Sequence, residues 1–227
     1  MVNSSNRRPV TAVSPNGLAA LLAVPVQPSG IVVFAHGSGS GRLSPRNNEV
    51  ADRLHEAGIA TLLLDLLMAD EEEERANVFD IPLLASRLAG AVDWLTGLPA
   101  VKHLPIGYFG ASTGAGAALL AASGPDRRIR AIVSRGGRPD LAGARALARV
   151  EAPTLLIVGG RDTPVIALNR AAMRHLHCPT KLIIVPGAHH LFEEPGALDA
   201  VIGHATRWFS SHFEEACDAI VDQATLR

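Results

Sequence analysis

The sequence predicts an α/β fold with a mostly parallel central sheet covered by helices on both faces. From Ile31 to the end of the chain, short apolar segments alternate with longer segments of helical spacing. The short segments are apolar throughout, which is typical of parallel strands buried on both faces. The 227 residues suffice for one large domain, and no repeat or linker divides them. We therefore expect a single domain over residues 1–227, with a core from about 17 to 213.

The N-terminal half begins with a predicted hairpin, because the turn sequence "SPNG" separates the short apolar segments "VTAV" and "AALLAV". "GIVVFAHG" then predicts a buried strand. The next helix lies in "SPRNNEVADRLHEAG", where Ser44 suits the N-cap, Pro45 the first helical position and Gly58 the stop. "IATLLLDL" predicts a second buried strand, and "MADEEEERANVFD" a polar loop with solvated glutamates.

The C-terminal half continues the alternation. "IPLLASRLAGAVDWLTGL" predicts a helix that ends near Gly97, and the strand "LPIGYFG" and the helix "TGAGAALLAAS" follow. Three more strands are predicted in "RIRAIVSRGG", "APTLLIVGGRD" and "TKLIIVPG". They are followed in turn by a short helix in "PDLAGARALARV", a helix in "PVIALNRAAMRHL" and a closing helix in "EPGALDAVIGHATRWFSSHFEEA". We expect about seven or eight strands, and no segment is long enough for a helical lid domain.

Composition excludes several classes of protein. The formal net charge of −1 favours neither nucleic acid nor a disordered acidic tail. No apolar run reaches the roughly 18 residues of a membrane span, and "MVNSSNRRPVTAV" lacks the apolar region of a secretory signal. Cys178 and Cys217 form no paired motif and are expected to be reduced thiols. We expect a cytoplasmic protein with a small-molecule substrate and no membrane or nucleic-acid partner; the oligomeric state is left open.

Candidate catalytic residues follow three of the predicted strands. "GASTG" puts Ser112 between two glycines at G-x-S-x-G spacing, directly after "IGYFG". Asp162 follows "LLIVGG", and His190 follows "LIIVPG". Ligands bind at the carboxyl ends of parallel strands, so these side chains belong at the edge where a site is expected. The chain order Ser, Asp, His, with the serine at a strand-to-helix turn, is the order of a nucleophile–acid–base set on such a sheet.

The chemistry of acyl transfer explains these residue types. A serine hydroxyl is a weak nucleophile and needs an adjacent base, which a histidine provides. A carboxylate on the far ring nitrogen fixes the tautomer and stabilises the imidazolium. Side chains at Gly110 or Gly114 would collide with neighbouring elements at a tight turn.

An oxyanion also needs hydrogen-bond donors. The backbone N–H of Thr113, at the start of the helix, is one candidate. The second should come from "HGSGSG", where glycines let the main chain approach a ligand. We expect the Ser38 amide in that role, with Gly39 as the alternative.

Together, "VVFAHGSGSG", "GASTGAG", "LLIVGGRD" and "VPGAHHLFEEPGALDAV" resemble the α/β-hydrolase superfamily, and within it the small dienelactone-hydrolase-like esterases. The resemblance covers about Gly30 to Phe213 and implies a Ser112–Asp162–His190 triad. We expect no cofactor or metal. The family's G-x-x-H-x-F spacing from Gly187 implies His190 rather than His189 as the base. Dienelactone hydrolases proper use a cysteine nucleophile, so Ser112 favours general ester hydrolysis. With no lid, the implied substrates are small soluble esters, lactones or thioesters.

Two other functions remain as alternatives. A non-catalytic binding protein could use the same scaffold. "GSGSGR", with Asp65 ending the next strand, also approaches a dinucleotide-binding fingerprint. Arg42 stands where that motif needs glycine, and Ser112 follows Tyr108 where a short-chain dehydrogenase has its lysine. No H-E-x-x-H or similar metal-binding spacing occurs.

Several arginines lie in loops at the expected functional edge: Arg42, Arg46, Arg135 and Arg138. Guanidinium groups bind carboxylates bidentately, so Arg42 and Arg135 are candidates for binding an acidic substrate. The alternative is that these arginines pair with nearby acidic side chains. His36, at the end of a strand, lines the pocket or makes a structural hydrogen bond.

Overall fold

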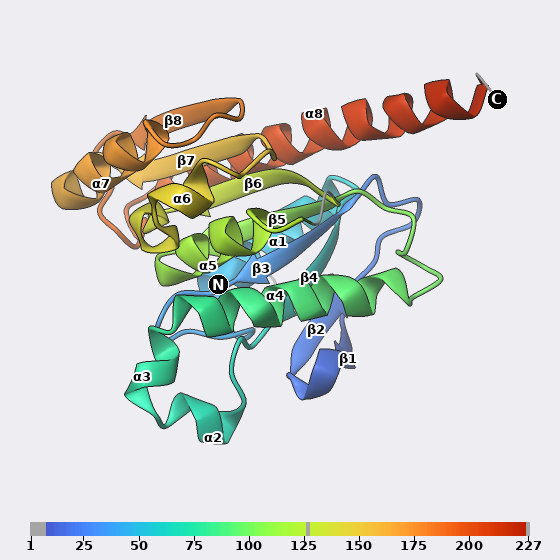
Figure 1. Ribbon diagram of the computed structural model, residues 1–227, viewed down its shortest axis with the longest axis horizontal. Helices are drawn as coiled ribbons and strands as arrows, with labels where there is room; N and C mark the ends of the chain where they lie inside the picture. The colour runs from blue at the N-terminus through green and yellow to red at the C-terminus, as the bar shows by residue number, and fades with distance from the viewer. Residues whose placement is uncertain (1–7, 126–127, 226–227) are drawn as a thin grey trace.

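The computed structural model describes residues 8–125 and 128–225, with side chains up to residue 216. Its eight-stranded sheet has the order β1-β2-β4-β3-β5-β6-β7-β8 (Figure 1). β1 (Thr11–Val13) and β2 (Ala20–Ala23) form the predicted antiparallel hairpin, and β2 pairs antiparallel with β4. All other pairings are parallel. The predicted mostly parallel sheet is therefore confirmed.

The six parallel strands are almost entirely buried, as their apolar sequences predict. They are β3 (Ile31–Ala35), β4 (Ala60–Leu64), β5 (Ile106–Ala111), β6 (Ile129–Arg135), β7 (Thr154–Gly159) and β8 (Thr180–Val185). The edge strand β8 is the more exposed exception. The carboxyl ends of these strands lie at one edge of the sheet, because the strands run in the same direction.

Helices cover both faces of the sheet (Figure 1). One apolar core lies between the sheet and α4 (Ile81–Thr96), α5 (Thr113–Ala122), α6 (Ala144–Leu147) and α7 (Thr163–Met173). A second core lies between the other face and α1 (Pro45–Glu56) and α8 (Ala197–Thr225). Burial of these two apolar cores is the main source of stability of such a layered fold.

Local signals position α1 as the sequence predicts. Ser44 is its N-cap, and the Ser44 side chain accepts a hydrogen bond from the Asn47 amide at 3.4 Å. Pro45 is the first helical residue, and Gly58 follows the helix with a φ of +77°. A positive φ costs glycine little, so the chain turns there into β4. The start of α1 is thereby fixed beside the loop that follows β3.

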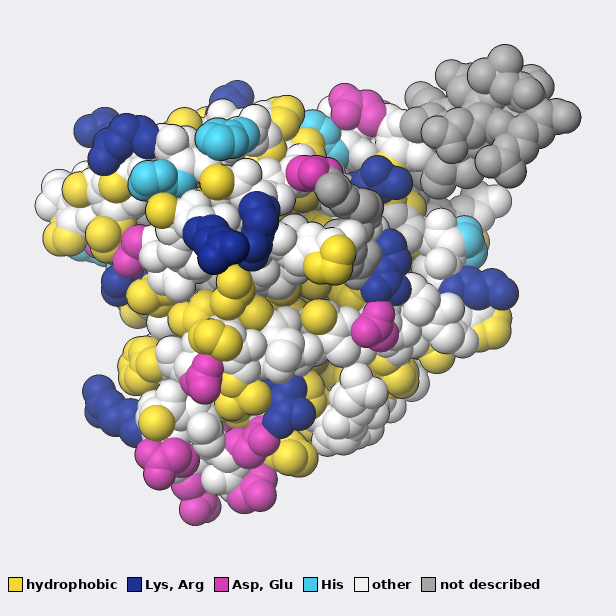
Figure 2. Space-filling model, in the orientation of Figure 1, with side chains coloured by type: hydrophobic (Ala, Val, Ile, Leu, Met, Phe, Trp, Pro, Cys, Tyr) yellow, Lys and Arg dark blue, Asp and Glu magenta, His cyan; other side chains and the backbone are white. Residues whose placement is uncertain are grey.

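The segment after β4 differs from the predicted polar loop. It contains two one-turn helices, α2 (Ala69–Glu72) and α3 (Arg75–Val78). The Glu71 carboxylate accepts from the Met68 amide at 2.9 Å, and Glu74 accepts from the Ala76 amide at 3.4 Å. These carboxylates accept hydrogen bonds from amides that have no partner within the helix, because they lie at its start. Acidic side chains gather over α2 and α3 in Figure 2, as expected for exposed glutamates, although Glu71 is half-buried and pairs with Arg87.

Two further predicted elements differ in detail. "PDLAGARALARV" forms a 3-10 helix at Pro139–Ala142 and then α6, because Gly143 has a φ of +80° between them. Cys178 is a half-buried free thiol, whereas the Cys217 side chain and the first seven residues lie outside the described part. Within the described residues, no helix is both long and apolar enough to cross a membrane.

Candidate active site

Ser112 occupies a sharp turn between β5 and α5. Its backbone has a φ of 49° and a ψ of −121°, a combination that a residue with a Cβ rarely adopts. Ser112 is at the N-cap position of α5, yet its side chain makes no capping hydrogen bond. Its amide donates to the Arg135 carbonyl at 3.3 Å, and its carbonyl accepts from the Arg138 amide at 3.0 Å. The surrounding backbone thus holds the turn and leaves the Ser112 hydroxyl unused by the helix.

Glycines allow this turn to pack tightly. A Cβ at Gly110 would lie 2.4 Å from the Ala115 Cα, and one at Gly114 would lie 2.2 Å from the Ala35 carbonyl oxygen. Real Cβ atoms do not approach backbone so closely, so a side chain at either position would displace α5 from the sheet. The predicted steric reason for these glycines is confirmed.

His190 and Asp162 are hydrogen-bonded through His190 Nδ1 and Asp162 Oδ2, 2.7 Å apart. Asp162 follows β7 and is the N-cap residue of α7, but its side chain does not cap the helix. Backbone bonds join the two loops, since the Gly160 amide donates to Val185 and the Arg161 amide to Ala188. The Asp162 side chain is 13% exposed and that of His190 is 39% exposed. The His190 ring is therefore hydrogen-bonded to a largely buried carboxylate while the ring itself is partly accessible to solvent.

His189 lies in a different environment from His190. Its ring contacts the Glu194 carboxylate, which also accepts from the His189 amide at 3.1 Å. The pKa of Glu194 is lowered chiefly by the hydrogen bond with the His189 side chain. The His189 side chain is 61% exposed. Of the two neighbouring histidines, it is therefore His190 that contacts Asp162.

The glycine-rich loop after β3 lies against the start of α5. The Ser38 amide donates to the Thr113 hydroxyl oxygen at 3.0 Å. The Leu66 amide donates to His36 Nε2 at 3.0 Å, and His36 Nδ1 lies 3.0 Å from the Gly37 carbonyl oxygen. This pattern requires a neutral His36 that donates from Nδ1. His36 therefore joins the loop to the end of β4 while it also lines the cavity beside the loop.

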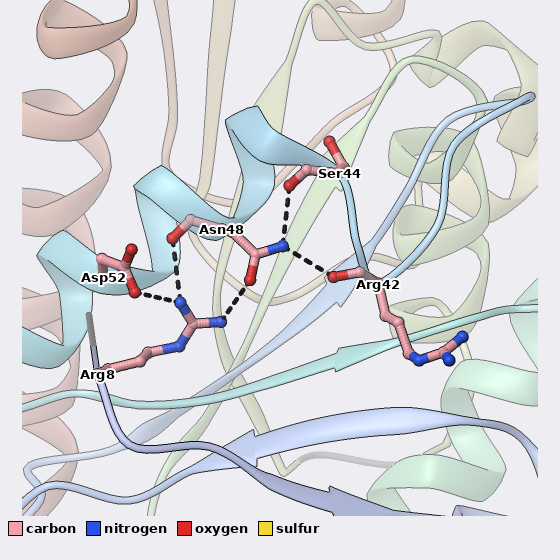
Figure 3. Close-up of polar contacts among 5 residues, drawn as sticks. All are labelled: Arg8, Arg42, Ser44, Asn48 and Asp52. Atoms are coloured by element: carbon pink, nitrogen blue, oxygen red, sulfur yellow. Dashed lines mark hydrogen bonds and ion pairs between the residues drawn. The ribbon is translucent and has the colours of Figure 1, made fainter. Parts of the chain in front are cut away.

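Arg8 and Asn48 fix the far end of the same loop (Figure 3). The Asn48 side-chain amide donates to the carbonyls of Arg42 and Ser44, both at 2.9 Å. Arg8 donates to the Asn48 carbonyl at 3.1 Å and to its side-chain oxygen at 3.0 Å, and it pairs with Asp52. No motif in the sequence indicates Arg8 or Asn48, because their partners are distant in the chain or are backbone carbonyls.

A cavity of about 720 Å³ lies between these loops and the start of α1. Ser112, His190, Ser38 and both predicted substrate-binding arginines, Arg42 and Arg135, line it. Its volume lies within the range that small-molecule sites occupy in proteins. These five residues, which the sequence places in several loops, therefore line one cavity in the structure.

The two predicted arginines differ within this cavity. Arg42 pairs with Asp65, and its amide also donates to that carboxylate at 2.6 Å. Arg135 is 7% exposed and donates to the Asn47 side-chain oxygen at 3.3 Å. Burial and the nearby Arg46 lower the pKa of Arg135 to about 10. The sequence does not indicate a role for Asn47, because a single asparagine at a helix start predicts no ligand.

Among the described side chains, no three His, Cys, Asp or Glu residues are grouped so that they could hold a metal ion. Arg138 donates to the Asp140 carboxylate at 2.7 and 2.9 Å, and these bonds raise its pKa. Arg138 therefore pairs with an acidic side chain two residues further along the chain.

The eight-stranded sheet, the serine turn after β5 and the histidine loop after β8 define an α/β-hydrolase fold, and no lid is present among the described residues. Residues 18–223 match the dienelactone hydrolase family model. The chain belongs to the dienelactone hydrolase family.

Solved structures show the same relationship. A dienelactone hydrolase from Anabaena variabilis is 55% identical, covers 91% of this chain and 98% of its own, and has a TM-score of 0.85. Est1E from Butyrivibrio proteoclasticus is 17% identical, covers 90% of this chain and 99% of its own, and has a TM-score of 0.76, which shows a shared fold.

Two curated relatives are longer proteins. Both are from Mycobacterium tuberculosis and are provisionally named phosphoribosyl transferases. Each is 59% identical over 198 residues, which are 87% of this chain and 44% of the relative. The chain thus spans less than half the length of these relatives.

Proposed function

We propose that the protein is a serine hydrolase that cleaves small esters through an acyl-enzyme intermediate on Ser112. The observation that carries the proposal is the strained Ser112 turn, which lines the same cavity as His190, whose ring is bonded to Asp162. A non-glycine residue at such a φ and ψ is retained where the local conformation has a role. Membership of the dienelactone hydrolase family supports the same chemistry.

In the proposed reaction, the Ser112 Oγ attacks the ester carbonyl while His190 Nε2 accepts the hydroxyl proton. Asp162 holds the His190 ring through Nδ1 and stabilises the imidazolium. The tetrahedral intermediate expels the alcohol, which receives the proton from His190. Water then loses a proton to His190 and attacks the acyl-enzyme. The bond from the acyl carbon to Ser112 Oγ breaks, His190 returns its proton to Oγ, and the acid is released.

The backbone N–H of Thr113 is the first proposed oxyanion donor, because it lies at the start of α5. The Ser38 amide is the second, with Gly39 as the alternative. Contact between Ser38 and Thr113 supports this pair, because it brings the two backbone segments together beside Ser112.

The proposed substrates are small esters, lactones or thioesters. The cavity is of the size of a small-molecule site, and no lid covers it in the described residues. The phosphoribosyl-transferase name of the curated relatives does not supply a better substrate, since more than half of each relative lies outside the match. Arg42 in place of the third glycine, paired with Asp65, argues against a dinucleotide site.

The proposal predicts that Ser112→Ala lowers kcat for 4-nitrophenyl butanoate by about 10⁵-fold or more, because the proposed set acts as a unit. A fluorophosphonate probe should label Ser112, as read by peptide mass spectrometry. Ser86→Ala, on the exposed surface of α4, is the control and should retain both activity and labelling. Labelling at Ser38 or Ser134, or an unlabelled but folded protein, would contradict the proposal and favour a binding protein.

A further inference from the structure

Arg135 is placed beside the proposed nucleophile by the sheet itself. It is the last residue of β6 and pairs in register with Ala111 of β5, the residue before Ser112. Its carbonyl accepts the Ser112 amide. Its side chain is on the same side of the sheet as Val133, facing α1, and lines the cavity. A substrate bound at Ser112 therefore lies within reach of this guanidinium.

The charge of Arg135 has no carboxylate partner among the described residues. Its guanidinium donates to Asn47 at 3.3 Å, and its Nε, buried, has no hydrogen-bond partner. Buried charges in proteins are normally paired, because an unpaired charge loses its hydration without compensation. Although burial and Arg46 lower its pKa to about 10, Arg135 remains protonated at neutral pH. The cavity wall therefore contains an uncompensated positive charge.

The neighbouring arginines, unlike Arg135, each have a carboxylate partner. Arg42 pairs with Asp65, Arg46 pairs with Glu193 at 2.8 Å, and Arg138 pairs with Asp140. Each of these carboxylates offsets one positive charge. The structure thus separates Arg135 from the arginines that the sequence groups with it.

The start of α1 adds positive potential at the same wall. Ser44, Pro45 and Arg46 line the cavity, so the N-terminal end of this twelve-residue helix, which carries a partial positive charge, borders it. Glu72, from α2, is the one cavity-lining acid without an ion pair in the described residues, and it also lines a smaller hollow on the Thr113 side of the glycine-rich loop. The positive groups therefore lie together on the α1 side.

We infer that Arg135 forms an anion-binding subsite, and that the enzyme prefers esters that carry a carboxylate or phosphate group. This inference rests on the proposed hydrolase function. The Arg135 guanidinium lines the cavity, its planar donors suit binding of either oxyanion, and Asn47 holds it in place from α1. Arg135 then determines which esters are bound and takes no part in bond cleavage.

The test compares three 4-nitrophenyl esters of equal reach: hexanoate, the adipate monoester and the 5-phosphonopentanoate. A second pair, phenyl hexanoate and 4-carboxyphenyl hexanoate, places the charge in the leaving alcohol. We expect at least one charged ester to be preferred. Arg135→Met should lower the ratio of its kcat/KM to that of the neutral ester by about tenfold to a hundredfold. Arg135→Lys should restore part of the ratio, because lysine keeps the charge without the fork.

Arg53→Met is the matched control, since Arg53 is an exposed arginine of α1 that pairs with Glu56; it should leave the ratio unchanged. Comparison of the carboxylate and phosphonate esters identifies which oxyanion is preferred. Wild-type cleavage of neutral esters with no charged-ester preference, or a preference that survives Arg135→Met, overturns the inference and leaves the hydrolase proposal intact. Failure to cleave any ester contradicts both.

Discussion

His189 and His190 are adjacent in the chain, yet only one of them contacts Asp162. We predict that His190→Ala lowers kcat by about 10⁵-fold or more, because the proposed base is lost. Steady-state kinetics on 4-nitrophenyl butanoate measures this effect.

His189→Ala is the matched control at the neighbouring position. Its ring contacts Glu194 and is largely exposed, so most of the activity should remain. Loss of activity in His189→Ala with retention in His190→Ala would mean that the spacing from Gly187 identifies the wrong base.

Single residues differ in how far the sequence reveals their roles. Gly110 and Gly114 predict the tight turn at Ser112, because no side chain fits there. The pairing of Arg42 with Asp65 could not be predicted, since it joins residues 23 apart on different loops. The same limit applies to Arg135, whose lack of a carboxylate partner is a property of the packed structure.

At the scale of elements, Arg8 joins the segment before β1 to α1 through Asn48 and Asp52 (Figure 3). The Arg8 side chain is 3% exposed. We predict that Arg8→Ala lowers the free energy of unfolding by about 1.5–3 kcal/mol, the usual contribution of hydrogen bonds to charged groups. Urea denaturation followed by circular dichroism measures this change. The loop carbonyls of Arg42 and Ser44 would then lose a well-anchored donor.

Arg53→Ala provides the comparison within the same helix. Arg53 and Glu56 are exposed and 3.2 Å apart, so this change should alter stability by no more than about 0.5 kcal/mol. Equal effects of the two substitutions would show that the Arg8 contacts are not specifically stabilising.

The strands and long helices follow from apolar patterns and caps, as Ser44 and Gly58 illustrate for α1. The short helices α2 and α3 do not, because side-chain contacts of Glu71 and Glu74 with nearby amides stabilise them. A run of glutamates has the same composition in a loop and in such helices, so composition alone cannot distinguish them.

For the whole molecule, the open cavity gives the last prediction. No lid covers the site in the described residues, so the rate of ester cleavage should rise hyperbolically with substrate and show no jump at the solubility limit. Tributyrin below and above that limit, followed by titration of released acid, provides the measurement. A sharp increase above the limit would indicate a covering segment that opens at an interface.

The mostly parallel sheet could be predicted because strands such as β3 and β7 are apolar on both faces. The order of the strands could not, since burial of each strand does not identify its neighbours. For example, β4 lies between β2 and β3, and β3 separates it from β5. These pairings determine which loops meet at the cavity.

The hydrogen bond from the Ser38 amide to the Thr113 hydroxyl oxygen has a consequence for the proposed oxyanion donor. The amide already has an acceptor before any substrate arrives, so an incoming oxygen must compete for it. A neutral ester carbonyl has little advantage over a hydroxyl, whereas a charged oxyanion is a much stronger acceptor. If the Ser38 amide is an oxyanion donor as proposed, a tetrahedral oxyanion would displace the Thr113 hydroxyl from it more readily than a bound ester would. Such a difference would favour the transition state over the ground state, which is the difference on which a rate enhancement depends.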